Sequence, residues 1–255
     1  MNHRKVPVQR YEKGEIAITS DNLAIETVIR LVCNDINVAT LLGSPSDINH
    51  LLIGHLLCEG YLGIDSLRGS VNNIESNCDS NGWQLSIELP SNLRMKPKNT
   101  GVTTSSCGAC NNDGLDQLIT ELPFATSKPQ IDESILFAGF SSMEKMQEGF
   151  AKTGGMHSAG LMSIGGELIT VSEDIGRHNA VDKVIGKCID DADFEKTVLL
   201  LSGRCGWDIV AKAARAKIPI IASIGACSTL AADCARHLGI RIYSFVRGNT
   251  STIVG

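Results

Sequence analysis

The second half of the chain repeats one pattern, in which a short apolar run is followed by a stretch with helical periodicity. The apolar runs are Leu168 to Val171, Val198 to Leu201, Ile218 to Ile224 and Ile240 to Val246. Short apolar runs that alternate with helices are typical of buried strands in an α/β sheet. The pattern therefore predicts an α/β domain in this half of the chain.

The stretches between these runs carry apolar residues at helical spacing, which predicts helices that face the core. The two predicted stripes are Val181, Val184, Ile185 and Cys188, and Leu230, Ala231, Cys234, Ala235 and Leu238.

The N-terminal third is predicted to be α+β. Thr27 to Cys33 and Ile36 to Leu42 flank Asn34-Asp35 and indicate a hairpin, and an Asn81-Gly82 turn indicates a second one. Between the hairpins we expect a helix with Ser44 as its N-cap. Its core stripe is Ile48, Leu51, Leu52 and Leu56.

The predicted fold class is thus mixed α/β, in two regions. Residues 1–123 form the α+β region and residues 132–255 the α/β domain, with the boundary between Pro123 and Asp132.

Composition limits the class of protein. The chain has 255 residues, 43% of them apolar, and a formal charge of 23 − 28 = −5. This acidity argues against a broad nucleic-acid surface. No apolar run approaches the roughly 20 residues that cross a bilayer, and no secretory signal is recognisable at the start. We expect a cytoplasmic protein that binds neither membrane nor nucleic acid.

Among the 9 cysteines, Cys107 and Cys110 stand out because they form a CxxC in a polar loop. A thiol there, ahead of a helix predicted over 113–121, can have a lowered pKa. The pair could be a thiol–disulfide couple, half of a zinc site, a sulfur-carrying nucleophile or merely structural. A structural zinc needs four ligands, and no second CxxC is present, so we expect no metal.

The segment from Thr153 to Gly160 joins a predicted helix to the next strand. Gly154 and Gly155 either expose backbone N–H groups to an anion or form a helix C-cap, and His157 follows directly. The zinc-deaminase signature is not matched, because Ala159 stands two residues after His157.

The densest polar run, Glu173 to Lys183, follows a predicted strand. Glu173 or Asp174 could accept hydrogen bonds from a nucleotide base, and Arg177 or Lys183 could meet phosphate. His178 and Asp182 are four residues apart and share a face of the predicted helix. Either a ligand site or a solvated polar surface explains this spacing.

Three more strand-to-helix or strand-end turns carry small or basic residues: Ser202 to Arg204, Gly225 to Ser228 and Phe245 to Thr250. Each can offer backbone amides or, at Arg204 and Arg247, a cation to a nucleotide. None matches a GxGxxG or P-loop motif, so each turn alone is weak evidence for a nucleotide site. We expect them to line one edge of the sheet.

Taken together, five motifs resemble the FdhD/NarQ family of formate dehydrogenase accessory proteins. They are Ser105 to Cys110 (SSCGAC), Gly154 to Ala159 (GGMHSA), Glu173 to Lys183 (EDIGRHNAVDK), Ser202 to Arg204 (SGR) and Phe245 to Gly248 (FVRG).

The resemblance implies a sulfurtransferase, namely a sulfur carrier with a cytidine-deaminase-like fold that acts as a homodimer. Such proteins take persulfide sulfur from a cysteine desulfurase and deliver it to the molybdenum or tungsten bis-guanine-dinucleotide cofactor of formate dehydrogenase. By motif position, Cys107 is the persulfide cysteine and Cys110 its partner. The expected cofactor contacts are Phe245, Val246, Arg247, Gly248, Asn249, Thr250, Gly155, His157, Glu173, Asp174, Arg177, Ser202 and Arg204.

The chain departs from the family pattern in two places. Asn111 stands where glycine is usual, and the tail Asn249 to Gly255 is shorter and less aromatic. The alternatives from other classes are a cofactor-binding chaperone that does not use the cysteines and a thiol oxidoreductase with a reversible Cys107–Cys110 disulfide.

Overall fold

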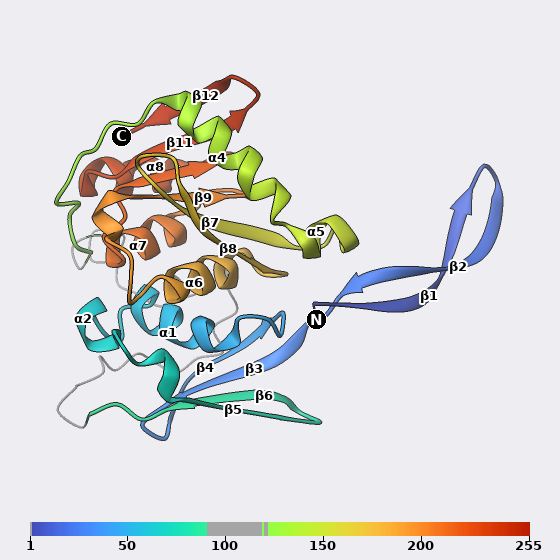
Figure 1. Ribbon diagram of the computed structural model, residues 1–255. Coiled ribbons are helices and arrows are strands. Elements are labelled where there is room, and N and C mark those ends of the chain that lie inside the picture. The colour runs from blue at the N-terminus through green and yellow to red at the C-terminus, as the bar shows by residue number, and fades with distance from the viewer. Residues whose placement is uncertain (1, 91–118, 120–121) are drawn as a thin grey trace.

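The computed structural model describes residues 2–90, 119 and 122–255 (Figure 1). Two sheets lie on either side of a double layer of helices, and a further helix covers the outer face of the larger sheet. The mixed α/β class expected from the sequence is therefore confirmed.

The larger sheet has six strands in the order β12-β11-β10-β9-β7-β8. The three strands β9, β10 and β11 are parallel to one another. Strand β7 is antiparallel to both β9 and β8, and β12 is antiparallel to β11. The bounds are β7 (His157–Ser163), β8 (Leu168–Asp174), β9 (Thr197–Leu201), β10 (Ile220–Ser223), β11 (Arg241–Arg247) and β12 (Thr250–Val254).

The central strands are continuously apolar because both their faces are buried. In β9, Val198 and Leu200 belong to the apolar cluster on one face of the sheet, while Leu199 and Leu201 belong to the cluster on the other. A strand covered on both faces has no polar side to present.

Helices cover both faces of this sheet. On the inner face lie α6 (Arg177–Lys187), α7 (Trp207–Arg215) and α8 (Thr229–Leu238), and on the outer face α4 (Glu133–Lys145), which α5 (Glu148–Thr153) follows (Figure 1). The short 3-10 helix η2 (Phe194–Lys196) leads into β9.

The smaller sheet has the order β4-β3-β6-β5 and contains both predicted hairpins. The second turn is Ser80-Asn81 and not the expected Asn81-Gly82, because Asp79 pairs with Gly82, which already belongs to the strand. Asn34 and Asp35 make the first turn with φ of 48° and 60°, the left-handed conformation that such two-residue turns require. The elements are β3 (Thr27–Cys33), β4 (Ile36–Gly43), α1 (Ile48–Cys58), α2 (Ile64–Leu67), η1 (Val71–Asn73), β5 (Ile74–Asp79) and β6 (Gly82–Ile87).

The start of α1 differs from expectation. Asp47, not Ser44, occupies the N-cap position, and its side chain makes no capping hydrogen bond. Ser44 is instead held outside the helix, where its backbone N–H donates to Asp174 Oδ2 at 3.0 Å. A contact distant in sequence has thus overridden a local capping signal.

Helix α1 is buried along most of its length, because the smaller sheet packs on one side and α6 on the other. At the crossing, a Cβ on Gly54 would overlap the Asp182 carbonyl oxygen, and a Cβ on Gly186 would overlap that of His50. The two backbones therefore touch through a reciprocal pair of glycines.

One apolar cluster runs from the smaller sheet through α1 and α6 into the larger sheet. Leu122 to Ile131, where the sequence places its boundary, contains no helix or strand. The division into two domains stays a prediction, and the two regions share a continuous core.

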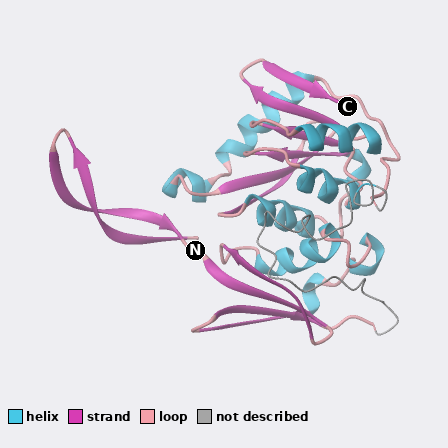
Figure 2. Ribbon diagram, turned by 180° about the vertical axis from the view of Figure 1, so that it is seen from behind, coloured by secondary structure: helices cyan, strands magenta, loops and turns pink. Residues whose placement is uncertain are grey.

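An N-terminal ribbon was not expected from the sequence. Strands β1 (His3–Glu12) and β2 (Glu15–Ala24) pair along their full length and project from the body, with their base near α5 (Figures 1 and 2). Tyr11, Ile16 and Ile18 near its tip are each at least 67% exposed. Within the described ranges, no helix is long and apolar enough to cross a membrane.

We expect Gly54→Ala to destabilise the protein by about 3 kcal/mol, because the added methyl must push α6 away at a backbone contact. Urea unfolding followed by circular dichroism measures the change. Gly63→Ala is the matched control, since a Cβ there meets nothing within 4 Å and its φ of −84° suits alanine. Equal stability of the two variants would contradict the close crossing.

Candidate functional site

The predicted ligand loops meet at one edge of the larger sheet. The parallel strands β9, β10 and β11 end there, and because β7 is antiparallel to β9, its first residue lies at the same edge. Backbone hydrogen bonds join the turns: Ser202 donates to Ser158 at 3.0 Å, Gly225 to Gly203 at 3.1 Å and Phe245 to Gly225 at 3.0 Å. We call this set of turns the ligand edge.

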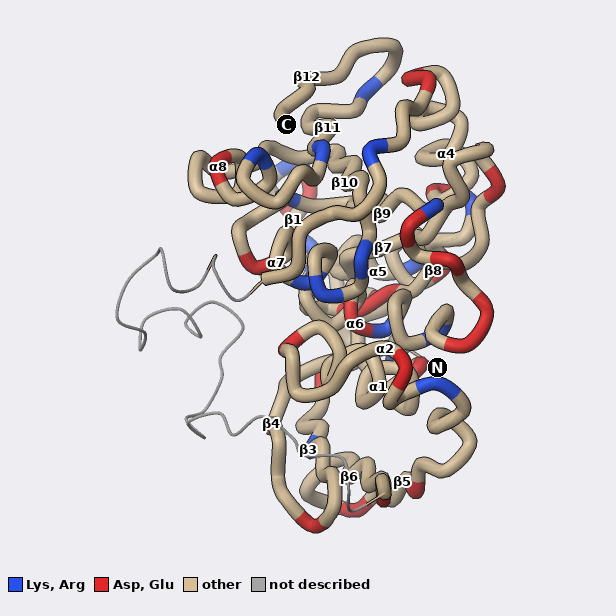
Figure 3. The backbone as a smooth tube through the Cα atoms, turned by 90° about the vertical axis from the view of Figure 1, so that its left-hand side faces the viewer, with Lys and Arg blue, Asp and Glu red and all other residues tan. Residues whose placement is uncertain are grey.

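Three arginines give the ligand edge its charge. Arg204 and Arg247 are exposed, and Arg247 is anchored by a 3.1 Å hydrogen bond from Nε to the Ile224 carbonyl. Arg177, one-third exposed, lies 3.8 Å from Asp208. Elsewhere basic and acidic residues are interspersed along the chain (Figure 3). The edge can therefore bind an anion in a protein with net negative charge.

His157 begins β7 and is half-buried at this edge. Burial lowers its pKa, and the cations Arg177 and Arg204 lower it further, against a smaller opposing effect of Asp174. The imidazole is therefore neutral at physiological pH and can accept a proton or a hydrogen bond.

Gly154 and Gly155 have different structural roles. Gly154 is the C-cap of α5 with φ of 64°, so the helix-cap interpretation is confirmed for this residue. Gly155 is exposed beside His157 and donates its N–H to Thr153 Oγ1 at 3.1 Å.

The carboxylates of Glu173 and Asp174, predicted to accept hydrogen bonds from a nucleotide base, accept them from the backbone of the protein itself. Glu173 accepts hydrogen bonds from the N–H groups of Gly149 and Phe150, at 2.7 and 2.8 Å, and so caps the start of α5. Asp174 is completely buried. Both carboxylates are used to join elements of the fold.

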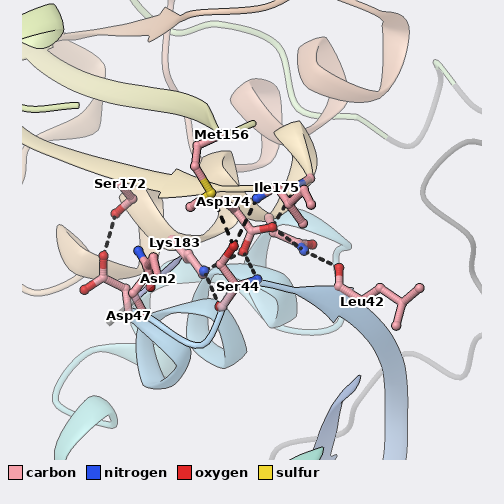
Figure 4. A network of polar contacts seen from close by, with 12 residues as sticks. Asn2, Leu42, Ser44, Asp47, Met156, Ser172, Asp174, Ile175 and Lys183 are labelled. Atoms are coloured by element: carbon pink, nitrogen blue, oxygen red, sulfur yellow. Dashed lines mark hydrogen bonds and ion pairs between the residues drawn. The ribbon is translucent and has the colours of Figure 1, made fainter. Parts of the chain in front are cut away.

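Asp174 is the centre of a buried polar network (Figure 4). Its carboxylate accepts hydrogen bonds from Lys183 Nζ at 2.5 Å, Ser44 N at 3.0 Å, Gly176 N at 2.7 Å and Asn179 Nδ2 at 3.1 Å. Lys183 also donates to the Ser44 carbonyl at 2.9 Å and is fully buried. The predicted contact of Lys183 with phosphate is therefore wrong, because its ammonium pairs internally.

The polar face of α6 is buried rather than solvated. Asp182 accepts from Lys212 Nζ at 2.7 Å, and Lys212 also pairs with Glu59 at 2.8 Å. Burial alone would lower the pKa of Lys212, but the two carboxylates outweigh burial and raise it. His178, on the same face, contacts Asp208 at the start of α7. This face joins α6 to α1 and α7.

Phe245 was expected to contact the cofactor only because of its place in the FVRG motif. Its φ of 53° is left-handed, it interrupts the pairing of β11 with β12, and its side chain is 48% exposed. A left-handed φ is uncommon for a bulky residue, and here it coincides with the break in strand pairing. Phe245 to Arg247 are the last residues of β11, and Gly248-Asn249 form the turn into β12. The segment was expected to follow the final strand, but it forms the last hairpin instead.

Cys107 and Cys110 lie outside the described residues, and so does the helix predicted over 113–121 except for Ile119. Their roles stay predictions. Within the described part of the chain, no group of three or more His, Cys, Asp or Glu side chains could hold a metal ion.

The fold and the ligand edge define an α/β protein that carries three arginines at one edge of its larger sheet. A family model described as the FdhD/NarQ family matches residues 24–254, and the chain belongs to this family.

Similar proteins agree with this assignment. Proteins named sulfur carrier protein FdhD from Sulfolobus acidocaldarius and Corynebacterium efficiens are each 33% identical, over 99% and 97% of this chain and 96% and 94% of theirs. A crystal structure from Desulfotalea psychrophila, provisionally described as a formate dehydrogenase accessory protein, has the same fold. Its TM-score is 0.77 at 21% identity, over 99% of this chain and 96% of that one.

We expect Arg204→Ala to raise the pKa of His157 toward the ordinary histidine value, because one of the two nearby cations is removed. Histidine NMR signals followed over pH 4 to 8 give the midpoint, with about 6.5 as the unperturbed reference. Arg236→Ala, on the exposed face of α8, is the control and should leave the midpoint unchanged. An unchanged midpoint in Arg204→Ala would contradict this electrostatic account.

Proposed function

We propose that this protein is a sulfur carrier that takes persulfide sulfur from a cysteine desulfurase on Cys107 and passes it to the molybdenum or tungsten bis-guanine-dinucleotide cofactor of formate dehydrogenase. Membership of the FdhD/NarQ family supports sulfur transfer in general. The observation that carries the cofactor part is the ligand edge, where turns far apart in sequence bring three arginines together.

The sulfur step requires a thiolate and two partners. The thiolate of Cys107 attacks the outer sulfur of the desulfurase persulfide, the S–S bond breaks, and the desulfurase leaves with its thiol restored. Cys110 assists the transfer.

The ligand edge matches the chemistry of a guanine dinucleotide. Arg204 and Arg247 are exposed cations for pyrophosphate, and the exposed ring of Phe245 offers a flat apolar surface for a base. Neutral His157, the first residue of β7, lies near Arg177 and Arg204 and can accept a proton or a hydrogen bond from the ligand. The cofactor is here the substrate of the transfer and is not held permanently.

We expect incubation with a desulfurase and cysteine to add about 32 Da, the mass of one sulfur atom, to the peptide that carries Cys107. Intact-mass and peptide mass spectrometry measure the adduct. Cys107→Ala should lack it, and Cys78→Ala, which removes an exposed cysteine of β5, should retain it. An adduct that persists when Cys107 and Cys110 are both alanine would show that the sulfur is carried elsewhere.

We expect Arg247→Ala to weaken binding of guanosine diphosphate about tenfold, because a charged hydrogen bond to phosphate contributes roughly 1.5–3 kcal/mol. Isothermal titration calorimetry measures the affinity, with Arg236→Ala as the surface-charge control. Unchanged affinity would remove Arg247 from the site.

The cofactor chaperone uses the same ligand edge but not the cysteines. Complementation of a strain that lacks its own carrier separates the two functions, because a carrier loses formate dehydrogenase activity in Cys107→Ala and a chaperone does not. If guanosine diphosphate still binds and activity is retained without Cys107, the protein is a chaperone.

A further inference from the structure

Two cysteines outside the CxxC lie side by side at the ligand edge. Cys205 follows the turn after β9, and Cys227 lies in the turn after β10. The Cys205 N–H donates to Ala226 O at 3.0 Å, and Ser228 N–H donates to Cys205 O at 3.1 Å, which pairs Cys205 with Cys227 in a parallel bridge.

This pairing holds the two cysteines at a backbone spacing that a disulfide can span. Paired residues on neighbouring parallel strands have Cα atoms about 4.8 Å apart and side chains on the same face. Disulfides form across Cα separations of about 4.4–6.8 Å. Cys205 and Cys227 therefore meet the distance requirement for a disulfide without movement of the backbone, although both are free thiols here.

The two thiols differ in access. Cys227 is partly exposed, whereas Cys205 is 1% exposed. Burial raises the pKa of the Cys205 thiol, and neighbouring Cys227 and Asp208 raise it further. An accessible thiol beside a buried one is the arrangement in which the first attacks an incoming sulfur compound and the second resolves the product.

The pair also lies where sulfur must be released. Cys205 directly follows Arg204, and the turn that carries Cys227 is hydrogen-bonded to Gly203 through Gly225. An anion formed at these thiols would appear beside the arginines of the ligand edge.

We infer that Cys227 and Cys205 form a dithiol that receives sulfur from a persulfide and releases it as hydrosulfide at the ligand edge. The inference rests on the proposed sulfur-carrier function and supplies what that function needs chemically. Persulfide sulfur has to gain two electrons to become sulfide, and a dithiol provides them.

The reaction has two steps. The Cys227 thiolate attacks the outer sulfur of a donor R–S–SH, the donor S–S bond breaks, and the donor leaves as R–SH, having taken up a proton. Cys205 then loses its proton and attacks Cys227 Sγ, the bond from Sγ to the terminal sulfur breaks, and hydrosulfide leaves. The products are R–SH, hydrogen sulfide and a Cys205–Cys227 disulfide.

Atoms and electrons balance without an external oxidant. The transferred sulfur gains two electrons, and each cysteine sulfur loses one in forming the disulfide. A reducing dithiol of the thioredoxin class would restore the pair for the next cycle.

The test uses the full-length chain with Cys107→Ser and Cys110→Ser, so that the CxxC does not take part. Glutathione persulfide is the donor, a sulfide-selective electrode measures hydrosulfide, and non-reducing peptide mass spectrometry detects the disulfide. We expect about one equivalent of hydrosulfide per chain, together with the Cys205–Cys227 disulfide peptide.

Further substitutions in this background identify the steps. With Cys205→Ser, Cys227 should retain an added sulfur of about 32 Da while hydrosulfide falls to the level of the Cys205→Ser/Cys227→Ser variant. With Cys227→Ser, which changes a partly exposed side chain, neither product should form. Cys188→Ser, at the end of α6, is the matched control and should behave as the parent.

Hydrosulfide release that is equal in the parent and in Cys227→Ser, or that leaves no Cys205–Cys227 disulfide, would overturn the inference. Because the donor is a small molecule and the CxxC is absent, this result does not depend on whether a desulfurase loads Cys107. Failure of the carrier function would instead appear as an unmodified Cys107 peptide after desulfurase treatment.

Discussion

The rest of the structure depends on the close crossing of α1 and α6. Gly54 and Gly186 let the two backbones touch, so that the smaller sheet, two helix layers and the larger sheet share one core. The same approach buries polar side chains of α6 beside α1, where Asp182 pairs with Lys212. Burying such charges is tolerated only when each has a partner, and here each partner comes from a different element.

These buried pairs connect the fold to the ligand edge. Asp174 ends β8 at that edge and accepts hydrogen bonds from Gly176 N–H and Asn179 at the start of α6. This is the helix that begins with Arg177, and Lys183 ties its middle to the same carboxylate. Removing one member of such a pair would leave an uncompensated buried charge, which is far more costly than losing an exposed ion pair. The position of Arg177 thus depends on the completely buried side chains of Asp174 and Lys183.

The sequence predicts the parts of this protein that depend on local pattern. The central strands β9, β10 and β11 are recognisable because both their faces are apolar. The turn at Asn34-Asp35 is recognisable because few residues suit its left-handed backbone. The role of Glu173 to Lys183 was not predictable, because a buried polar face and a solvated one have the same spacing, and only the packing of α1 decides between them. The N-terminal ribbon was missed since its strands bury too little to need an apolar period.

The N-terminal ribbon exposes unpaired strand edges to other copies of the chain. A two-stranded sheet consists of two edge strands, whose outward N–H and C=O groups are templates for further pairing. Apolar Ile16 and Ile18 favour such pairing, whereas Arg4 and Lys5 on β1 oppose it by charge repulsion and by the cost of desolvating them. Basic residues on this exposed strand thus raise the free-energy cost of edge-to-edge pairing between copies of the chain.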